Sequence, residues 1–429
     1  MIQRLFAAFS ILATVACATA SSSSTPSLGL AAADSVVIRN DIAYLASDEL
    51  GGRLTGTPGN NLAATYIARR YKSLNLRPAY AGYLQHFVAR PAARAHMGDT
   101  VGMQTQNVVA ILRGSDPQYA GQYIVIGAHF DHLGRETQYA MDPAAKDAIR
   151  NGADDNASGT AAVMQLARML SISKPRRSVI FAAFSGEEEG LLGSQYFVDN
   201  PPVPRDSIIA MVNFDMVGRL KDEKLLVYGT GSAAELSALL DSANSRSVPS
   251  FKLAGGGDGF GSSDQSSFYA KNIPVLHFFT DIHDDYHRAT DDVEKINAGG
   301  EARVIDLAYR VIESIDDRPS RLTFVKSAGP TRVAASSSGS QAYLGSIPNM
   351  SAGTVPGLKL SGVRAGSPAD KGGLKADDII VEFGGMAVTD LQTYSDALYA
   401  RKPGDVVKVV FLRDGKKMET SVTLGTRGG

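Results

Sequence analysis

Short apolar runs alternate with helical repeats along most of the chain. Six runs are almost continuously apolar, which is typical of strands covered on both faces of a sheet. They are residues 108–112, 123–127, 179–184, 208–214, 225–228 and 275–279. Helical repeats occupy residues 160–170, 233–244 and 302–315, and also 38–71, where a glycine-rich stretch at 51–59 interrupts the repeat. Strands alternating with helices predict an α/β fold, a three-layer sandwich around a mostly parallel mixed sheet.

A second, smaller unit is expected at the C-terminal end. Residues 327–340 are rich in Ser, Ala and Gly, a composition typical of linkers. Beyond them the pattern predicts strands at 358–363, 379–383, 406–412 and 420–424, with short helices near 366–370 and 389–400. We therefore expect an α/β domain over residues 37–322, a linker at 323–340 and a small β-rich domain at 341–426.

The first 20 residues have the features of a secretory signal peptide. Arg4 precedes an apolar run from residue 5 to 16, and Ala18-Thr19-Ala20 fits a cleavage site. Cys17 ends a segment that loosely resembles a bacterial lipobox without its usual first leucine, so a lipid anchor there is the alternative. Residues 21–36 form a polar tether, and no later run has the length of a transmembrane helix. We expect an exported protein, periplasmic or secreted.

The composition of the chain excludes some kinds of partner and some kinds of metal ligand. The 43 basic and 44 acidic residues give a formal net charge of −1, which argues against a general nucleic-acid binder. The chain has a single cysteine, so no internal disulfide can form. Any zinc site must use histidine and carboxylate ligands.

Side chains that commonly bind metals follow four of the predicted strands. They are His129 and Asp131 after 123–127, Glu187 and Glu188 after 179–184, Asp215 after 208–214, and His287 after 275–279, with Asp154 ahead of the helix at 160–170. In open α/β sheets, sites form beyond the carboxyl ends of the strands, so we expect these residues to converge. Imidazole and carboxylate donors without sulfur suit Zn²⁺ in an open catalytic site.

Most of these residues also have a structural explanation when taken singly. His129 fits a hydrogen-bonded core histidine, Asp154 fits a helix N-cap, and residues 187–189 fit a solvated turn. His287 and Asp291, four residues apart, fit a surface ion pair. Because all these explanations would have to coincide at one sheet edge, a metal site is the better interpretation.

Five segments together resemble the M28 family of zinc metallopeptidases, which includes co-catalytic di-zinc aminopeptidases. The segments are residues 127–131 (GAHFD), 151–159 (NGADDNASG), 186–194 (GEEEGLLGS), 213–216 (NFDM) and 285–288 (DYHR). They occur in the order of the family, and the resemblance covers about residues 40–318. It implies a zinc-exopeptidase type of sandwich.

The resemblance also implies a metal-binding role for five residues. Asp154 would bridge two zinc ions, His129 and Asp215 would complete one site, and Glu188 and His287 the other. This assignment requires Asp154 to lie within bonding distance of both His129 and His287.

Three further residues receive catalytic roles from the resemblance. Glu187 would be the general base, Asp131 would orient the ring of His129, and Tyr286 would stabilise the oxyanion. Different roles for adjacent glutamates make physical sense, because a carboxylate bound to a metal cannot also carry a proton between water and the leaving amine.

The C-terminal unit resembles a PDZ domain of the kind found in bacterial exported proteases. The resemblance rests on residues 362–369 (GVRAGSPA) and 373–380 (GLKADDII). Tyr343, Leu344 and Gly345 lie where such domains hold a peptide carboxylate on backbone N–H groups. A C-terminal peptide is therefore the expected ligand, and a docking or stabilising role is the alternative.

These observations favour an exported di-zinc exopeptidase, most simply an aminopeptidase acting on peptides with a free N-terminus. Two alternatives stay open: a single-zinc enzyme like the glutaminyl cyclases, and a non-catalytic peptide-binding protein on a peptidase scaffold. The presence of both His129 and Asp215 favours two metals over one.

Overall fold

The structure is a computed structural model of the 429-residue chain. It describes residue 1 and residues 32–426, apart from 91–101, 138, 143, 327–341, 349–356, 364–365, 390–392, 395–396 and 399. The predicted signal peptide, Cys17 and the Ser-rich part of the predicted linker lie outside the described residues. Of the helices in the described ranges, none has both the length and the apolar character of a membrane span.

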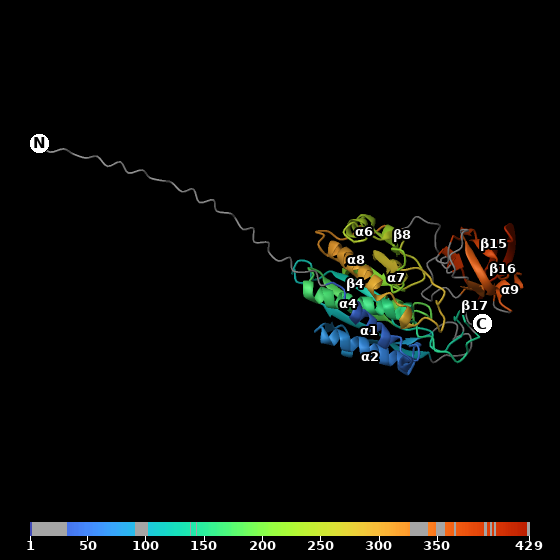
Figure 1. The fold of residues 1–429 in the computed structure, drawn as a ribbon, viewed down its shortest axis with the longest axis horizontal. Coiled ribbons are helices and arrows are strands. Elements are labelled where there is room, and N and C mark those ends of the chain that lie inside the picture. The colour runs from blue at the N-terminus through green and yellow to red at the C-terminus, as the bar shows by residue number, and fades with distance from the viewer. Residues whose placement is uncertain are drawn as a thin grey trace. The chain divides into compact units, whose positions relative to one another are not determined.

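A nine-stranded mixed sheet forms the centre of the described α/β region (Figure 1). Its strands are β1 (Arg77–Pro78), β2 (Leu84–Ala89), β3 (Met103–Leu112), β4 (Tyr123–His129), β5 (Ser178–Phe184), β6 (Ile208–Phe214), β7 (Lys224–Tyr228), β8 (Lys252–Gly256) and β9 (Val275–Phe279). The order is β1-β3-β5-β4-β6-β9-β7-β8, with β2 paired to β3. The adjacent strands β5, β4, β6 and β9 are all parallel.

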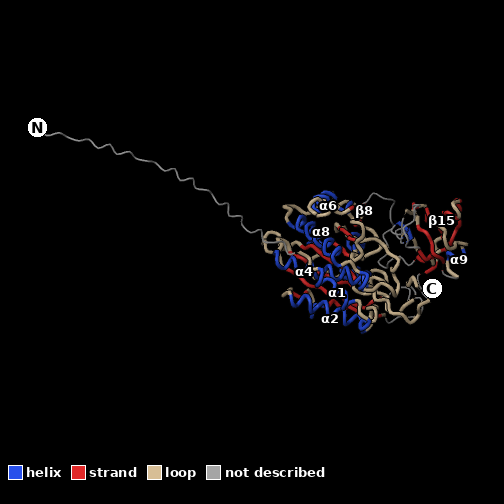
Figure 2. Tube along the Cα trace, viewed as in Figure 1, coloured by secondary structure: helices blue, strands red, loops and turns tan. Residues whose placement is uncertain are grey.

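Helices cover both faces of this sheet, and Figure 2 shows the strands running among them. They are α1 (Ser35–Leu45), α2 (Pro58–Ser73), α4 (Gly159–Ser173), α5 (Leu192–Asp199), α6 (Leu236–Asn244), α7 (Gln265–Tyr269) and α8 (Ala298–Asp316). Alternate residues of β5 belong to different cores. Phe181 packs in the larger core with α1, α2, α4, α6 and α8, whereas Ile180 packs with Phe197 of α5 and Phe268 of α7. The predicted three-layer sandwich is therefore confirmed.

Burial on both faces explains why the central strands could be recognised in the sequence. Every residue of β4, β5 and β6 is buried, so each strand reads as a continuous apolar run. The sequence pattern missed β1, β2 and β8, together with the short helices α5 and α7. Side chains of β2 and β8 alternate or lie mostly exposed, so they leave no continuous run.

The C-terminal region has its own hydrophobic core, built around residues such as Leu344, Leu360 and Phe383. Its elements are β10 (Ala342–Tyr343), β11 (Ser346–Pro348), β12 (Leu358–Val363), α9 (Pro368–Lys371), β13 (Ile379–Phe383), β14 (Met386–Ala387), β15 (Val406–Arg413), β16 (Lys416–Thr423) and β17 (Gly425–Thr426). The strands pair antiparallel, in agreement with the β-rich prediction. The helix predicted at 389–400 falls partly outside the described residues.

Because the central strands are parallel and in register, the loops that carry the candidate metal ligands all leave the sheet at the edge formed by the carboxyl ends of the strands. His129 at the end of β4 is in register with Phe184 at the end of β5. Asn213 near the end of β6 is in register with His277 of β9. The loops that follow these four strands therefore leave the sheet side by side.

Candidate metal centre

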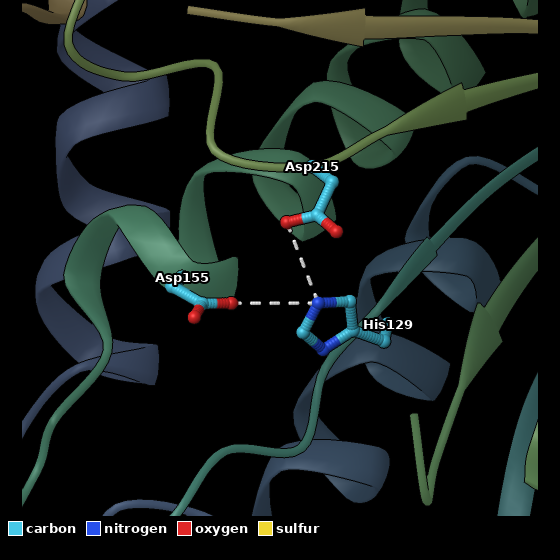
Figure 3. Close-up of side chains that lie close together, drawn as sticks. All are labelled: His129, Asp155 and Asp215. Atoms are coloured by element: carbon cyan, nitrogen blue, oxygen red, sulfur yellow. Dashed lines mark ion pairs between the residues drawn. The ribbon is translucent and has the colours of Figure 1, made fainter. Parts of the chain in front are cut away.

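The first group of donor atoms surrounds the Nε2 atom of His129, the last residue of β4. This atom lies 3.5 Å from Asp155 Oδ1 and 3.5 Å from Asp215 Oδ1 (Figure 3). Asp155 comes from the irregular turn Ala153–Ser158 that precedes α4, and Asp215 directly follows β6. One donor atom from each of the three residues lies within 4.8 Å of the others, close enough to share an ion.

The second group uses the other oxygen of the same aspartate. Asp155 Oδ2 lies 3.1 Å from His287 Nε2, which in turn lies 3.2 Å from Glu188 Oε2. His287 comes from the loop after β9 and Glu188 from the loop after β5. The Asp155 carboxylate thus offers one oxygen to each histidine, the arrangement expected of a bridging ligand.

The predicted bridging role of Asp154 is wrong in this structure. Asp154 is buried with its Oδ1 accepting the N–H of Gly218 at 2.7 Å and its Oδ2 lying 3.1 Å from His283 Nε2. It therefore faces away from His129 and His287, and the neighbouring Asp155 takes the place between them. Consecutive aspartates in a non-helical turn point in different directions, so the sequence motif alone does not decide which one faces the histidines.

The tautomers of both histidines suit zinc. His287 Nδ1 lies 2.9 Å from the carbonyl oxygen of Tyr139, and His129 Nδ1 lies 3.2 Å from that of Asp131. Because a carbonyl oxygen only accepts hydrogen bonds, Nδ1 carries the proton in the neutral form of each ring, and the lone pair of Nε2 is then the one that can bind a metal. Both lone pairs face carboxylates, so the donor set of two imidazoles and three carboxylates fits Zn²⁺.

The carboxylates around these donor atoms also favour positive charge at the site. Burial opposes protonation of His129, but the carboxylates of Asp215 and Glu187 outweigh it and raise its pKa well above the usual value. The pKa of His287 is raised in the same way by Glu188 and Asp155. Burial would raise the pKa of Glu188, yet His287 and His132 hold it well below the usual range. Positive charge at either imidazole is therefore stabilised by the carboxylates, and a divalent ion can supply the same charge.

Asp131 lies beside His129, but the ring nitrogen contacts its backbone carbonyl oxygen more closely than its carboxylate. Its Oδ1 lies 3.7 Å from His129 Nδ1 and accepts the backbone N–H of Glu187 at 3.2 Å. Its Oδ2 accepts the hydroxyl of Thr55 at 2.9 Å. Asp131 therefore ties the His129 loop to the segment that carries the two glutamates.

Glu187 and Tyr286 flank the donor groups. Glu187 Oε2 lies 3.9 Å from His129 Nε2, and its side chain keeps 12% of its surface exposed. Burial raises the pKa of Glu187 well above the usual value. The ring of Tyr286 stacks on His287 with 3.9 Å between centroids.

Sequence reasoning missed Arg53, which connects two of the loops that carry the site. The residue is fully buried, and its guanidinium donates to the carbonyl oxygens of Phe130 at 2.7 Å, Asn151 at 2.6 Å and Gly152 at 3.0 Å. Burial lowers its pKa to about 10, so it stays charged. The only signal in the sequence was a charged residue within the glycine-rich stretch at 51–59.

The alternative explanation of Asp291 as half of a surface ion pair with His287 is wrong. It is fully buried, and its Oδ2 accepts the backbone N–H groups of Asp154 at 2.9 Å and Asp155 at 3.0 Å. Its Oδ1 binds Arg219 Nη2 at 2.9 Å. Asp291 therefore fixes the turn that presents Asp155, and its partners are far away in the sequence.

Solved structures with the same fold show which class of fold the α/β region has. A Zn-dependent exopeptidase from Parabacteroides distasonis covers 66% of this chain and 98% of its own, with 20% identity and a TM-score of 0.55. A glutaminyl cyclase from Porphyromonas gingivalis covers 66% and 98%, with 21% identity and a TM-score of 0.54. At such identities the likeness is one of fold, and it shows that the α/β region has the zinc-exopeptidase type of sandwich.

The family follows from the sequence itself. Residues 107–312 match the model of Peptidase family M28, and residues 341–424 match that of the PDZ domain. The chain therefore carries an M28 peptidase domain followed by a PDZ domain, which confirms both resemblances.

Curated relatives align with part of this chain. A probable zinc metalloprotease from Pyrenophora teres f. teres is 38% identical over 117 residues, which are 27% of this chain and 23% of the relative. An aminopeptidase from Pseudomonas aeruginosa is 33% identical over 130 residues, 30% of this chain and 21% of the relative. The chain thus spans only about a fifth to a quarter of the length of these two relatives.

Proposed function

We propose that this protein is an exported co-catalytic di-zinc exopeptidase that removes N-terminal residues from peptides. The observation that carries the proposal is the Asp155 carboxylate between His129 and His287, each of which has a further carboxylate of its own. This arrangement supports two adjacent metal sites, with Asp155 as the shared ligand. Zinc is the expected metal because the chain carries an M28 domain and its donors are imidazole and carboxylate.

The residues around the donor atoms have different roles in the proposed hydrolysis of a peptide bond. Bound zinc ions would polarise the scissile carbonyl and make water more acidic. Glu187, outside both donor groups, takes a proton from the attacking water and passes it to the leaving amine. Tyr286 donates its phenolic hydrogen to the carbonyl oxygen as negative charge develops there. Asp131 keeps His129 oriented throughout.

The surroundings of the site suit a peptide with a free, apolar N-terminal residue. The carboxylates of the donor groups favour the positively charged α-amine. Met216, Leu226 and Phe279 form a small apolar cluster with the partly buried side chains of Tyr228, Ile282 and Tyr286. Because Met216 follows Asp215 and Tyr286 precedes His287, this cluster borders both donor groups. We expect it to receive the first side chain of the substrate.

Hydrolysis of a leucine anilide tests this function directly. We expect turnover by the zinc-loaded protein, loss of at least 100-fold after chelation, and recovery on adding zinc, because the chemistry depends on the metal. The same anilide with an acetylated α-amine should not be cleaved, since its nitrogen can no longer carry a charge. Equal cleavage of the free and acetylated substrates would contradict an aminopeptidase and favour an endopeptidase.

A glutaminyl cyclase is the second candidate, because the Porphyromonas gingivalis enzyme of that name has the same fold. A cyclase with a single zinc would not need a second histidine beside Asp155, whereas His129 here has both Asp155 and Asp215 within 3.5 Å. Two zinc ions per chain favour the peptidase. One ion, with release of ammonia from peptides that begin with glutamine, favours the cyclase. A non-catalytic binding protein is disfavoured because both donor groups and Glu187 are intact.

The PDZ domain is proposed to bind the C-terminus of a peptide. Gly345 has a φ of +82°, and a Cβ there would lie 2.2 Å from Ser367 Cβ, so only glycine fits this turn. The carbonyl oxygen of Leu344 accepts the N–H of Ala369 at 2.8 Å, which fixes the loop before β11. Among the described strands β11 lies at the end of its sheet, where a peptide strand can add. Docking or stabilisation stays the alternative role.

Export of the protein rests on the sequence of residues 1–20 alone. The basic residue, apolar run and cleavage site support a periplasmic or secreted location, with acylation of Cys17 as the alternative to its removal.

A further inference from the structure

His132 is a buried histidine at the second donor group and is not among the proposed metal ligands or catalytic residues. Its side chain is completely inaccessible to solvent, and its Nδ1 lies 2.8 Å from Glu188 Oε1. The other oxygen of that carboxylate, Oε2, lies 3.2 Å from His287 Nε2. The two oxygens of Glu188 therefore face two different histidines.

Distances distinguish the parts played by these histidines. Donor atoms about 2.0–2.1 Å from a tetrahedral zinc lie about 3.3 Å from one another. The distances from His287 Nε2 to Asp155 Oδ2 and Glu188 Oε2, 3.1 and 3.2 Å, match that spacing. The 2.8 Å between His132 Nδ1 and Glu188 Oε1 is shorter and is typical of a hydrogen bond. His132 Nδ1 also lies 3.8 Å from Asp155 Oδ2, beyond that spacing.

The chemistry of the contact gives the direction of the hydrogen bond. A carboxylate that binds a metal only accepts hydrogen bonds, so Nδ1 of His132 must donate. His132 Nε2 is buried and has no hydrogen-bond partner among the described residues, which leaves the bond to Glu188 as the closest polar contact of the ring. The ring also stands edge-on to His287, with 5.6 Å between centroids, which restricts its rotation.

We propose that His132 is a positioning residue for the second metal. Its Nδ1–H holds Glu188 Oε1, so that Oε2 alone faces His287 and the ion. The inference rests on the proposed two-metal function. Loss of an outer hydrogen-bond partner of a metal ligand typically weakens metal binding 10–100-fold. We expect a loss of this size at one of the two sites, because the hydrogen bond of His132 goes to Glu188, a donor of the second group only.

Two substitutions of similar size separate a hydrogen-bond donor from a metal ligand. The amide nitrogen of asparagine occupies nearly the position of histidine Nδ1 and can donate to Glu188, but it is a poor zinc ligand. Leucine has a similar volume and no donor. His132→Asn should therefore retain metal binding at both sites, and His132→Leu should weaken it at the second site.

The experiment is a titration of metal-stripped full-length protein with zinc, followed by calorimetry in a competing chelator. We expect two zinc sites in the wild type, one site weakened 10–100-fold in H132L, and both sites within about threefold of wild type in H132N. The exposed His86 supplies a control, and H86L should bind as the wild type does. Thermal melting of the zinc-loaded variants checks that they fold.

Three outcomes overturn the proposal, and each is distinct. Unchanged binding by H132L shows that the contact does not position Glu188. Equal losses in H132N and H132L show that His132 is a ligand or is needed for its shape. A loss in H132L at both sites alike shows a general structural effect. If the wild type binds only one zinc, the proposed two-metal function itself fails, which the titration shows without any variant.

Discussion

Glu187→Gln should lower kcat about 10²–10⁴-fold while leaving two zinc ions bound, because this carboxylate moves the proton and does not bind the metals. Glutamine has the same shape but cannot accept a proton from water. Glu187 lies in a position that suits this role, since its side chain remains 12% exposed, close to His129 and outside both donor groups. Anilide hydrolysis and elemental analysis of the same preparation measure the two quantities.

Glu189→Gln is the matched control for this experiment, because Glu189 lies in the same turn and has no assigned role. We expect this variant to retain wild-type kcat. Full activity of the Glu187 variant would rule out its role as the base. A loss of zinc together with activity would make Glu187 a metal ligand instead.

Asp155→Asn and Asp154→Asn should behave in opposite ways. Asp155 offers one oxygen to each histidine, so its amide variant should lose zinc from both sites and lower activity by more than about 100-fold, beyond the effect of an outer-shell change. Asparagine at 154 can still accept the N–H of Gly218 through its Oδ1, so that variant should keep two zinc ions. Metal content after dialysis and anilide turnover give the comparison.

The pair is informative because the two aspartates are adjacent and both buried. Zinc lost from the Asp154 variant and kept by the Asp155 variant would restore the assignment made from the sequence. Equal loss in both would indicate that the turn, rather than one carboxylate, holds the metals.

The strands that are buried on both faces of the sheet could be predicted from the sequence. β6 and β9 were predicted residue for residue, because strands buried on both faces read as continuous apolar runs. The parallel arrangement then implied that His129, Asp215 and His287 would meet at one edge, which the structure shows. Strands with exposed side chains, such as β8, carry no such signal.

The errors in the site have a different physical origin. The choice between Asp154 and Asp155 depends on the backbone of one irregular turn, and that turn is fixed from outside by Asp291. Arg53 and His132 act through contacts 56 to 99 residues away in the chain. Hydrogen bonds of this kind leave no periodic pattern, so they become visible only when the loops are placed in space.

Crystallography of the zinc-loaded protein, with anomalous data collected at the zinc edge, would show whether Asp155 lies between two zinc ions. We predict two anomalous peaks about 3.5–4 Å apart, one on each side of the Asp155 carboxylate. The first should lie near His129 and Asp215, and the second near Glu188 and His287. A single peak, or a pair of peaks bridged by Asp154, would contradict the account.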